Sequence, residues 1–379
     1  MKIGIIAFPY DRGRSGIWNY IKNLITEIVA LDRDNEYYIF TSHNFNLNQN
    51  NVTQVLFGSK WINNPIINIL WHQLYLPYAA NRFKLDILHL PAGNRRMILF
   101  KNCKIVTTVH DLSQFHVANK YGILRMIYTN KILPLIANHL NKIISISEST
   151  KKDILRYWKA KDKDIVILPN GIDRDFLIKI KGMDGKKAER VLEKYKINGD
   201  FIFYVSRLEH PGKNHVGFIK AYDRLRQETG LPHKLVLAGS GWSRTDAIFN
   251  EAKRSRFSSD IIFTDYIPED EMPYLYTAAK LFAFPSLYEG FGIPLLEAMA
   301  CGTPIICSNV SSMPEVLDDC GLLFDPKDPE DMAGKMKMML TDPGLRAQCV
   351  KKGLERVKAF NWEDVAGRTV QIYKDICNG

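Results

Sequence analysis

The stretch Pro285-Ser286-Leu287-Tyr288-Glu289-Gly290-Phe291-Gly292-Ile293-Pro294-Leu295-Leu296-Glu297-Ala298-Met299-Ala300-Cys301-Gly302-Thr303-Pro304 decides the fold of this chain. The apolar run that leads into it is bounded by turn residues, which predicts a buried strand. Pro294 and the apolar residues after it are typical of the first turns of a helix. Gly290 and Gly292, between the two, let the backbone approach a ligand closely. The unpaired amides of such a helix start favour an anion.

Two carboxylates, Glu289 and Glu297, frame this predicted anion site. Carboxylates would repel a phosphate that they touched, whereas they accept hydrogen bonds from hydroxyl groups in pairs. Sugars and riboses both offer neighbouring hydroxyls. A single glutamate at a turn is more often simply solvated, so the prediction depends on the complete string. The string therefore predicts a site for a diphosphate that carries hydroxyl-rich groups.

Two cations, Arg207 and Lys213, follow another apolar run, Phe201–Val205, and precede a predicted helix. They would balance a diphosphate, and their value would grow as negative charge develops on a leaving group. With two cations and a helix start available, no metal is required. Asp-x-Asp strings occur at 32–34, 162–164 and 173–175, but each carries a cation between its acids. We interpret these strings as solvated loop charges, so no cofactor or metal is expected.

Short apolar runs alternate with amphipathic ones along the 379 residues, which predicts α/β domains with parallel sheets covered by helices. The length indicates two domains. We place the first at 1–175 with 361–379 added, and the second at 176–360. The predicted strands are Ile3–Ala7, Tyr37–Thr41, Ile87–Leu90, Lys104–Val109, Lys142–Ile146 and Ile165–Leu168, then Phe201–Val205, Lys234–Ala238, Ile261–Phe263, Lys280–Pro285 and Pro304–Cys307.

The Glu-x7-Glu string with its following Cys-Gly-Thr-Pro resembles the signature of retaining glycosyltransferases of family 4. The resemblance implies the GT-B fold, in which two Rossmann-like doubly wound domains face a central cleft and a C-terminal helix crosses back to the first domain. It further implies that Glu289 holds hydroxyls of the donor sugar and Glu297 the ribose. By the same resemblance, the diphosphate lies on the backbone of Gly290, Phe291, Gly292 and Ile293, and Arg207 and Lys213 contact it.

Weaker positions follow from the same resemblance. Gly16 matches a family glycine that opens a helix toward the donor, although Ser15 replaces the glycine that usually precedes it. His110, at the end of a strand and followed by Asp111, resembles the mannosyltransferase-like group of O-antigen and exopolysaccharide enzymes most closely. The resemblance places His110 beside the donor sugar, as a catalytic-site residue but not as an assigned general base. The other weaker positions, with expected contacts to the nucleotide, are Gly239, Tyr266 and Ile267.

A nicotinamide-dependent oxidoreductase is disfavoured by the loop that follows the first strand. Its glycines, Gly13 and Gly16, are three residues apart and do not form the Gly-x-Gly-x-x-Gly pattern of a dinucleotide site.

Asn170-Gly171 matches a family hinge string, and we favour an ordinary turn there. No nucleic-acid motif is present, so nucleic acid is not an expected partner.

The formal net charge of +10 is concentrated in residues 81–161, which hold fifteen Lys or Arg and four acidic residues. Such a surface suits an acceptor that carries a pyrophosphate, or anionic lipid headgroups. The alternative is an ordinary solvated basic surface that binds no partner. Residues 61–81 contain too many polar and helix-breaking residues for a bilayer span, and a helix over 66–75 is predicted there. Six scattered cysteines and the absence of a secretory leader favour a cytoplasmic protein, peripheral on the inner face of the membrane if it meets lipid.

The resemblance to family 4, together with these observations, implies a retaining, metal-independent hexosyltransferase. The donor is a nucleoside diphosphate sugar, with UDP-glucose favoured and GDP-mannose as the other candidate, and the acceptor is a lipid-linked oligosaccharide or a polysaccharide. The alternatives are a GT-B nucleotide-sugar epimerase and a non-catalytic nucleotide-sugar binding protein. The base, the sugar, the acceptor and the oligomeric state depend on contacts that the sequence does not specify.

Overall fold

The computed structural model describes residues 1–8, 16–58, 65–99, 102–117 and 122–378. The chain forms two compact units, the first made of residues 1–171 with 361–379 and the second of residues 172–360. The first crossing between the units therefore falls four residues before the boundary expected at 175–176. No helix in the described ranges is both long and apolar enough to cross a membrane.

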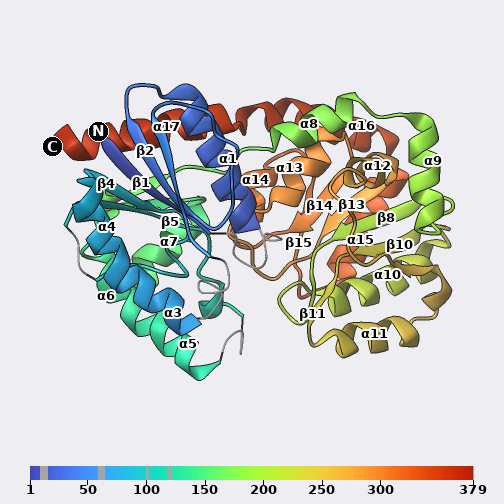
Figure 1. Ribbon diagram of the computed structural model, residues 1–379. Helices are drawn as coiled ribbons and strands as arrows, with labels where there is room; N and C mark the ends of the chain where they lie inside the picture. Colours follow the sequence, from blue (N-terminus) through green and yellow to red (C-terminus); the bar gives the residue numbers. More distant parts are fainter. Residues whose placement is uncertain (9–15, 59–64, 100–101, 118–121, 379) are drawn as a thin grey trace. The chain divides into compact units, whose positions relative to one another are not determined.

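Unit 1 is built on a seven-stranded parallel sheet with the order β3-β2-β1-β4-β5-β6-β7 (Figure 1). The order reverses between β1 and β4, which is where loops diverge at the carboxyl edge of such a sheet. The strands are β1 (Lys2–Ala7), β2 (Glu36–Thr41), β3 (Val52–Leu56), β4 (Ile87–Leu90), β5 (Lys104–Val109), β6 (Lys142–Ser145) and β7 (Ile165–Ile167).

Helices cover both faces of this sheet. On one face α1 (Gly16–Leu31) packs along the C-terminal helix α17 (Trp362–Asn378). The other face is covered by two long helical segments and a shorter one, whose apolar side chains join one core with the strands. The first long segment runs from α3 (Pro65–Leu70) through a π-helical turn at 71–75 to α4 (Leu76–Phe83). The second runs from α5 (Ile123–Ile127) through a π-helical turn at 128–132 to α6 (Leu133–Ala137). The shorter segment begins with α7 (Glu148–Asp153).

Unit 2 has a six-stranded parallel sheet, ordered β12-β10-β8-β13-β14-β15, and a two-stranded sheet of β9 and β11. Its strands are β8 (Phe201–Val205), β9 (Leu208–Glu209), β10 (Lys234–Ala238), β11 (Gly241–Ser243), β12 (Ile261–Phe263), β13 (Leu281–Phe284), β14 (Ile305–Ser308) and β15 (Leu322–Phe324). Its helices are α8 (Arg174–Lys181), α9 (Gly185–Lys194), α10 (His215–Thr229), α11 (Thr245–Arg254), α12 (Met272–Ala278), α13 (Ile293–Ala300), α14 (Met313–Leu317), α15 (Pro329–Thr341) and α16 (Pro343–Arg356).

The eleven predicted strands are all present, with ends shifted by no more than one residue. The prediction missed four strands: β3, which mixes polar and apolar residues and has no fully buried position, and β9, β11 and β15, which are only two or three residues long. The helix predicted over 66–75 is longer than expected and continues to Phe83. The interpretation of Asp32 as a solvated charge is wrong. Asp32 is buried and accepts hydrogen bonds from Tyr37 and Asn35, so its carboxylate closes the turn between α1 and β2.

A chain of buried hydrogen bonds ties the two helices α1 and α17 to the centre of the unit 1 sheet. Tyr20 on α1 bonds Thr108 on β5 (3.1 Å), and Thr108 bonds His89 on β4 (2.9 Å). The other ring nitrogen of His89 bonds Tyr373 on α17 (2.6 Å). Burial lowers the pKa of His89 to about 3, so the imidazole is neutral and can donate at one nitrogen and accept at the other.

Gly171 packs against Asn361 and Trp362, where the chain returns from unit 2 to unit 1. A Cβ at this position would lie 2.6 Å from the backbone nitrogen of Trp362 and 2.8 Å from the carbonyl carbon of Asn361. Backbone atoms at the start of a long helix cannot move aside cheaply. Asn170-Gly171 is thus the place where the return segment packs, which explains its composition without a ligand.

We predict that Gly171→Ala lowers the stability of the protein by about 1–3 kcal/mol, because the methyl group forces the start of α17 away. Gly122→Ala is the matched control in the same unit, since a Cβ there meets nothing within 4 Å. Thermal unfolding of the full chain measures both. Equal unfolding temperatures for the two variants would show that the return segment does not need a glycine at 171.

Candidate functional site

Most of the predicted site residues of unit 2 come together at the carboxyl edge of its sheet. The strand order reverses between β8 and β13, and ligands of open α/β sheets bind at such a point. Arg207 and Lys213 follow β8, whereas Glu289 follows β13. The neighbouring strands β10 and β12 lead to Gly239 and Tyr266. Residues that are up to 82 positions apart are therefore brought to one edge because their strands are neighbours.

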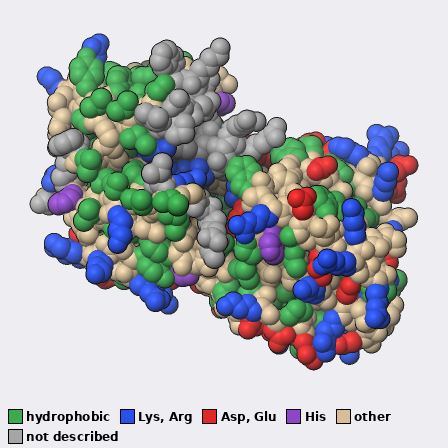
Figure 2. Space-filling model, turned by 90° about the horizontal axis from the view of Figure 1, so that it is seen from below, with side chains coloured by type: hydrophobic (Ala, Val, Ile, Leu, Met, Phe, Trp, Pro, Cys, Tyr) green, Lys and Arg blue, Asp and Glu red, His purple; other side chains and the backbone are tan. Residues whose placement is uncertain are grey.

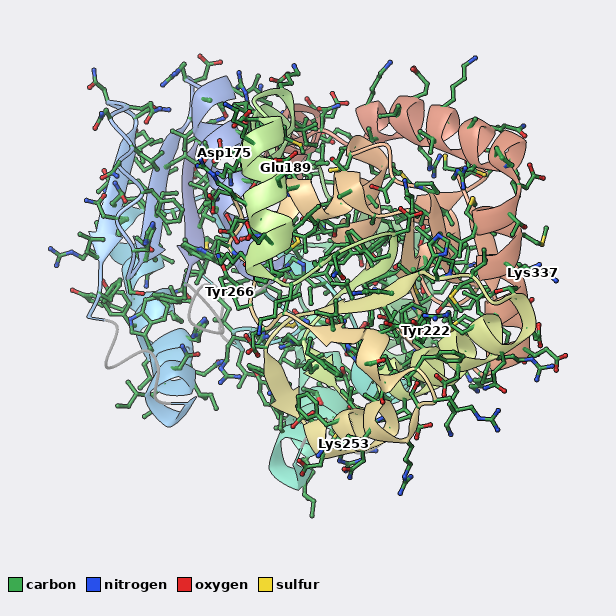
Figure 3. All side chains as sticks on the ribbon, turned by 90° about the vertical axis from the view of Figure 1, so that its right-hand side faces the viewer. Asp175, Glu189, Tyr222, Lys253, Tyr266 and Lys337 are labelled. Carbon is green, nitrogen blue, oxygen red and sulfur yellow. The ribbon has the colours of Figure 1, made fainter. Side chains whose placement is uncertain are left out.

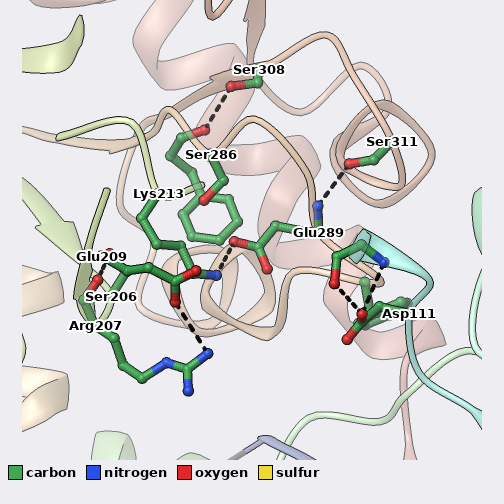
Figure 4. A network of polar contacts seen from close by, with 12 residues as sticks. Asp111, Ser206, Arg207, Glu209, Lys213, Ser286, Glu289, Ser308 and Ser311 are labelled. Carbon is green, nitrogen blue, oxygen red and sulfur yellow. Dashed lines mark hydrogen bonds and ion pairs between the residues drawn. The ribbon is translucent and has the colours of Figure 1, made fainter. Parts of the chain in front are cut away.

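The centre of this edge is an ion pair between Lys213 and Glu289, with Nζ and Oε1 2.6 Å apart (Figure 4). The side chains are only 18% and 15% exposed. The backbone around Glu289 is also fixed, because its amide donates to Ser311 (3.0 Å) and its carbonyl accepts from Ser312 (3.0 Å). A charged pair that is so little exposed is held in one geometry and interacts more strongly than a surface pair.

The two loops that carry this pair are joined to each other. The hydroxyl of Tyr204 donates to the carbonyl of Lys213 (2.8 Å), and the amide of Leu287 donates to the carbonyl of Gly212 (2.9 Å). Tyr204 is buried at the end of β8, so it connects the lysine loop to the sheet. The position of Lys213 is thereby set by buried groups of the domain core.

Arg207 is held differently from Lys213. Its guanidinium lies 3.6 Å from the carboxylate of Glu209 and 4.5 Å from the ring centre of Trp242, and its side chain is 41% exposed. Glu209 and Trp242 were missed from the sequence, because the strands that pair them, β9 and β11, are two and three residues long. The glutamate and the indole orient the arginine, and an indole face is a favourable neighbour for a guanidinium.

Two of the predicted glycines are required by backbone geometry. Gly239 has φ +133°, and a Cβ there would lie 1.9 Å from the carbonyl oxygen of Ser206. Its amide donates to the carbonyl of Asp265 (2.9 Å). Gly292 has φ +107° and is the N-cap residue of α13. The close approach at Gly239 is thus made to another loop, and its predicted contact with a nucleotide stays a prediction.

The start of α13 has the predicted form. The helix begins at Ile293, with Pro294 in its first turn, directly after Gly292. The hydroxyl of Ser312 reaches the carbonyls of Glu289 (3.0 Å) and Phe291 (2.8 Å), which fixes the glycine turn. The first amides of a helix have no partner within the helix and carry its positive end, so this turn suits a phosphate.

Glu297, one turn into α13, accepts a hydrogen bond from the buried hydroxyl of Tyr276 (2.7 Å). Burial raises the pKa of the Glu297 carboxyl to about 7, which the bond from Tyr276 opposes and the nearby Asp173 and Glu269 reinforce. Near neutral pH the group is therefore present in both protonation states. Its predicted bond to a ribose is not tested by this arrangement.

Tyr266 and Ile267 follow β12, and they differ in exposure. Tyr266, labelled in Figure 3, has a side chain that is 49% exposed, whereas Ile267 is buried. The residue before them, Asp265, has φ +56° and its carbonyl receives the amide of Gly239. The loop is thus joined to the glycine loop of β10, and the contact of either residue with a nucleobase stays a prediction.

His110 and Gly16 belong to unit 1. His110 follows β5, with one ring nitrogen 2.6 Å from the carbonyl of Pro91 and its ring edge-on to Tyr20, 4.7 Å between centres. Burial lowers the pKa of His110 to about 4, so it is neutral at pH 7. Asp111 accepts from the amide and hydroxyl of Ser113. Gly16 is the exposed first residue of α1, and Ser15 lies outside the described residues.

A cavity of about 690 Å³ lies elsewhere on unit 1 and contains none of the predicted site residues. It is formed at the amino ends of β5, β6 and β7 against α17, with Lys104, Lys142 and Arg368 in its lining. In the part of the chain that the structure describes, no group of three or more His, Cys, Asp or Glu side chains is placed to hold a metal.

Two parallel-sheet α/β domains, each with helices packed on its sheet, define the class as the GT-B fold of glycosyltransferases. Sucrose-phosphate synthase from Thermosynechococcus elongatus superposes with a TM-score of 0.76 at 20% identity over 99% of both chains. Anabaena HepE, solved in complex with UDP, superposes with a TM-score of 0.74 at 16% identity over 99% of this chain and 100% of HepE. Identities this low establish the fold alone.

The sequence comparisons then give the family. Residues 14–176 match the model for Glycosyltransferase Family 4, and residues 187–356 match the model for Glycosyl transferases group 1. The chain therefore belongs to the family 4 type of glycosyltransferases. It resembles O-antigen chain mannosyltransferase B of Escherichia coli, with 39% identity over 186 residues, which are 48% of each protein. The chain thus spans about half the length of this relative, and the resemblance to the mannosyltransferase-like group is confirmed.

We predict that Glu297→Gln removes a pH dependence of stability. The folded pKa of about 7 lies above the unfolded value of about 4.3, so the folded state holds more protons between these values. The contribution of the protonated Glu297 carboxyl to the free energy of unfolding is fully present below about pH 4.3, and it is lost as the pH rises through about 7. The difference in unfolding free energy, variant minus wild type, should therefore increase over this range and then level off.

Urea unfolding at a series of pH values measures that difference. Glu193→Gln, at an exposed position of α9, is the matched control and should show no such trend. A difference between Glu297→Gln and wild type that stays constant from acid to alkaline pH would mean that Glu297 has an ordinary carboxyl pKa.

Proposed function

We propose that the protein is a retaining hexosyltransferase that takes its sugar from a nucleoside diphosphate donor bound by unit 2. The observation that carries the proposal is the ion pair of Lys213 and Glu289 beside the glycine turn of α13. The pair combines a cation and a carboxylate in one fixed place. A phosphate next to a hydroxyl-rich sugar presents the complementary groups, an anion and hydrogen-bond donors.

The ion pair explains how an acidic side chain, Glu289, can belong to a site for an anion. Lys213 neutralises Glu289 at 2.6 Å, so the local charge before ligand binding is close to zero. Lys213 has three donors and can bond a phosphate oxygen while it still contacts Glu289. The second oxygen of Glu289 is then available to the sugar hydroxyls. Arg207, oriented by Glu209 and Trp242, supplies the second positive charge.

Catalysis would come from stabilisation of the leaving nucleoside diphosphate. As the bond between the sugar and phosphate breaks, negative charge grows on the diphosphate, and cations and helix amides held beside it become more favourable. No proton transfer by the protein is needed for this effect. Neutral His110, whose ring nitrogen is bonded to the Pro91 carbonyl, agrees with a role other than that of a charged acid. We propose no metal in this step.

The identity of the donor stays between UDP-glucose and GDP-mannose. The name of the Escherichia coli relative, an O-antigen chain mannosyltransferase, favours mannose and therefore the second donor. UDP-glucose, which was favoured from the sequence, is the other candidate; HepE was solved with UDP, but at 16% identity it shows only the fold. We propose a glycan acceptor, polymeric or lipid-linked, for the same reason, because the relative's name refers to an O-antigen chain.

We predict that Arg207→Ala, Lys213→Ala and Glu289→Ala each reduce turnover of the cognate sugar nucleotide by about a hundredfold or more, because each removes a charge that acts on the leaving group or sugar. Lys253→Ala, at an exposed site on α11 of the same unit, should leave turnover unchanged. The assay follows release of nucleoside diphosphate with a glycan acceptor present.

The product distinguishes the proposed function from the two alternatives. A transferase moves the hexose to the acceptor with retained anomeric configuration, whereas an epimerase alters the sugar without any acceptor. A binding protein would bind the sugar nucleotide and release no diphosphate. Unchanged turnover in Glu289→Ala and Arg207→Ala would reject the assigned residues even if transfer itself were observed.

A further inference from the structure

The two long helical segments of unit 1, 65–83 and 123–137, expose an unusual number of large apolar side chains. Both segments bury one side against the same sheet face, so their other sides are turned away from the core. On that outer side Leu74 is 68% exposed, Ile123 80% and Leu135 68%. We call the six of these side chains that repeat every four residues the apolar helix face; they are Leu70, Leu74, Tyr78, Ile123, Ile127 and Leu135, and Ile69 (36%) and Ile132 (40%) are exposed beside them.

The spacing within each segment shows that the exposure is organised. Leu70, Leu74 and Tyr78 are four residues apart and are followed at the same interval by Arg82, which bonds the Tyr78 hydroxyl (3.2 Å). Ile123, Ile127 and Leu135 also lie on one four-residue repeat, in which Lys131 takes the remaining place. Residues four apart lie on one side of a helix, so each segment presents an apolar stripe with a cation in it.

The two segments form one surface. Arg96 connects them, because its Nε donates to Asn68 on α3 (2.9 Å) and its guanidinium lies 5.9 Å from the ring centre of Tyr128 in the second segment. Figure 2 looks onto this side of the molecule and shows hydrophobic side chains interspersed with Lys and Arg over the helices of unit 1.

Acidic residues are absent from both segments. Neither 65–83 nor 123–137 contains an Asp or Glu, and the whole stretch 37–147 has two acidic residues against eleven Lys or Arg. Each of the two acids lies outside the segments, at Asp86 and Asp111. An apolar surface with cations and no carboxylates is matched by a partner that offers hydrocarbon and negative charge together.

We propose that the apolar helix face of unit 1 binds the surface of an anionic lipid bilayer, with its leucine and isoleucine side chains among the acyl chains and Arg82, Arg125 and Lys131 at the headgroups. A second copy of the same face is the less favourable occupant, because pairing it with itself would bring cations together without any carboxylate. The segments lie on the membrane and do not span it. This inference uses no donor or acceptor and does not depend on the proposed function.

Co-sedimentation with vesicles tests the proposal on the full chain. Vesicles of phosphatidylcholine mixed with phosphatidylglycerol should bind the protein, and raising the salt concentration should weaken binding. Vesicles of phosphatidylcholine alone should bind at least about tenfold less. Leu74→Ser with Ile127→Ser should lower partitioning onto the anionic vesicles by about tenfold or more, because both side chains leave the hydrocarbon.

Matched variants remove apolar or cationic side chains outside the apolar helix face, and so separate the effect of this face from a general loss of apolar area or charge. Ile178→Ser with Leu354→Ser removes two exposed apolar side chains of unit 2 and should bind like wild type. Arg82→Gln with Lys131→Gln should lower anionic binding, whereas Lys253→Gln with Lys337→Gln, which project from the outside of α11 and α15 (Figure 3), should not. Circular dichroism confirms that each variant is folded.

Three results would overturn the proposal. The first is no binding to anionic vesicles by the folded wild-type protein. The second is equal, salt-insensitive binding to neutral vesicles, which would remove the anionic lipid as the occupant. The third is concentration-dependent self-association that is abolished by Leu74→Ser with Ile127→Ser while vesicle binding is unaffected, which would assign the face to a second copy.

Discussion

The ion pair between Lys213 and Glu289 is the interaction on which the account of unit 2 depends. It joins the loop after β8 to the loop after β13 at 2.6 Å, with little exposure of either side chain. The opposite charges of the pair neutralise each other, so in the proposed site the lysine would meet an anion and the carboxylate would meet hydroxyl groups. Without it, Glu289 would repel the phosphate that the neighbouring helix start attracts.

The strand order makes this pair possible in physical terms. The strands β8 and β13 are hydrogen-bonded neighbours at the point where the strand order reverses. The loops that follow them therefore start side by side at the carboxyl edge of the sheet, where the amide of Leu287 donates to the carbonyl of Gly212. Tyr204, Ser311 and Ser312 then fix the loops through bonds to backbone groups. The side chains of Lys213 and Glu289 are thus positioned by the core of the domain and by short backbone contacts, which is the fixed geometry that the proposed site requires.

Much of this could be predicted from the sequence. The apolar runs of β8 and β10 are strands with four of their five residues buried, β13 is buried throughout, and Gly292 with Pro294 marks the start of α13. The family resemblance supplied the roles of Glu289 and Lys213, and the structure shows the two in contact. That contact was not predicted, because nothing in the sequence says that the lysine expected to bind phosphate and the carboxylate expected to bind the sugar pair with each other.

Other features could not be predicted for local reasons. The strands β9 and β11 are too short to show a period, so Glu209 and Trp242 were not connected with Arg207. Asp32 stands in a charged stretch, Asp32-Arg33-Asp34, that is typical of a surface loop. The hydrogen bond from the Tyr37 hydroxyl to its carboxylate becomes visible only in the folded structure. The charge count of residues 81–161 indicated a basic domain, but the repeat of exposed leucine and isoleucine on two helices became visible only when their buried sides were known.

The most direct test of the central claim is calorimetry of Glu289→Gln and wild type with UDP and GDP, and with UDP-glucose and GDP-mannose. If Glu289 holds the sugar and neutralises Lys213, the variant should bind the cognate nucleoside diphosphate as tightly as wild type or more tightly, because Lys213 is freed for the phosphate. It should bind the matching sugar nucleotide about tenfold or more weakly, because a charge-assisted bond is lost. Equal losses for both ligands, or no change for either, would contradict the account.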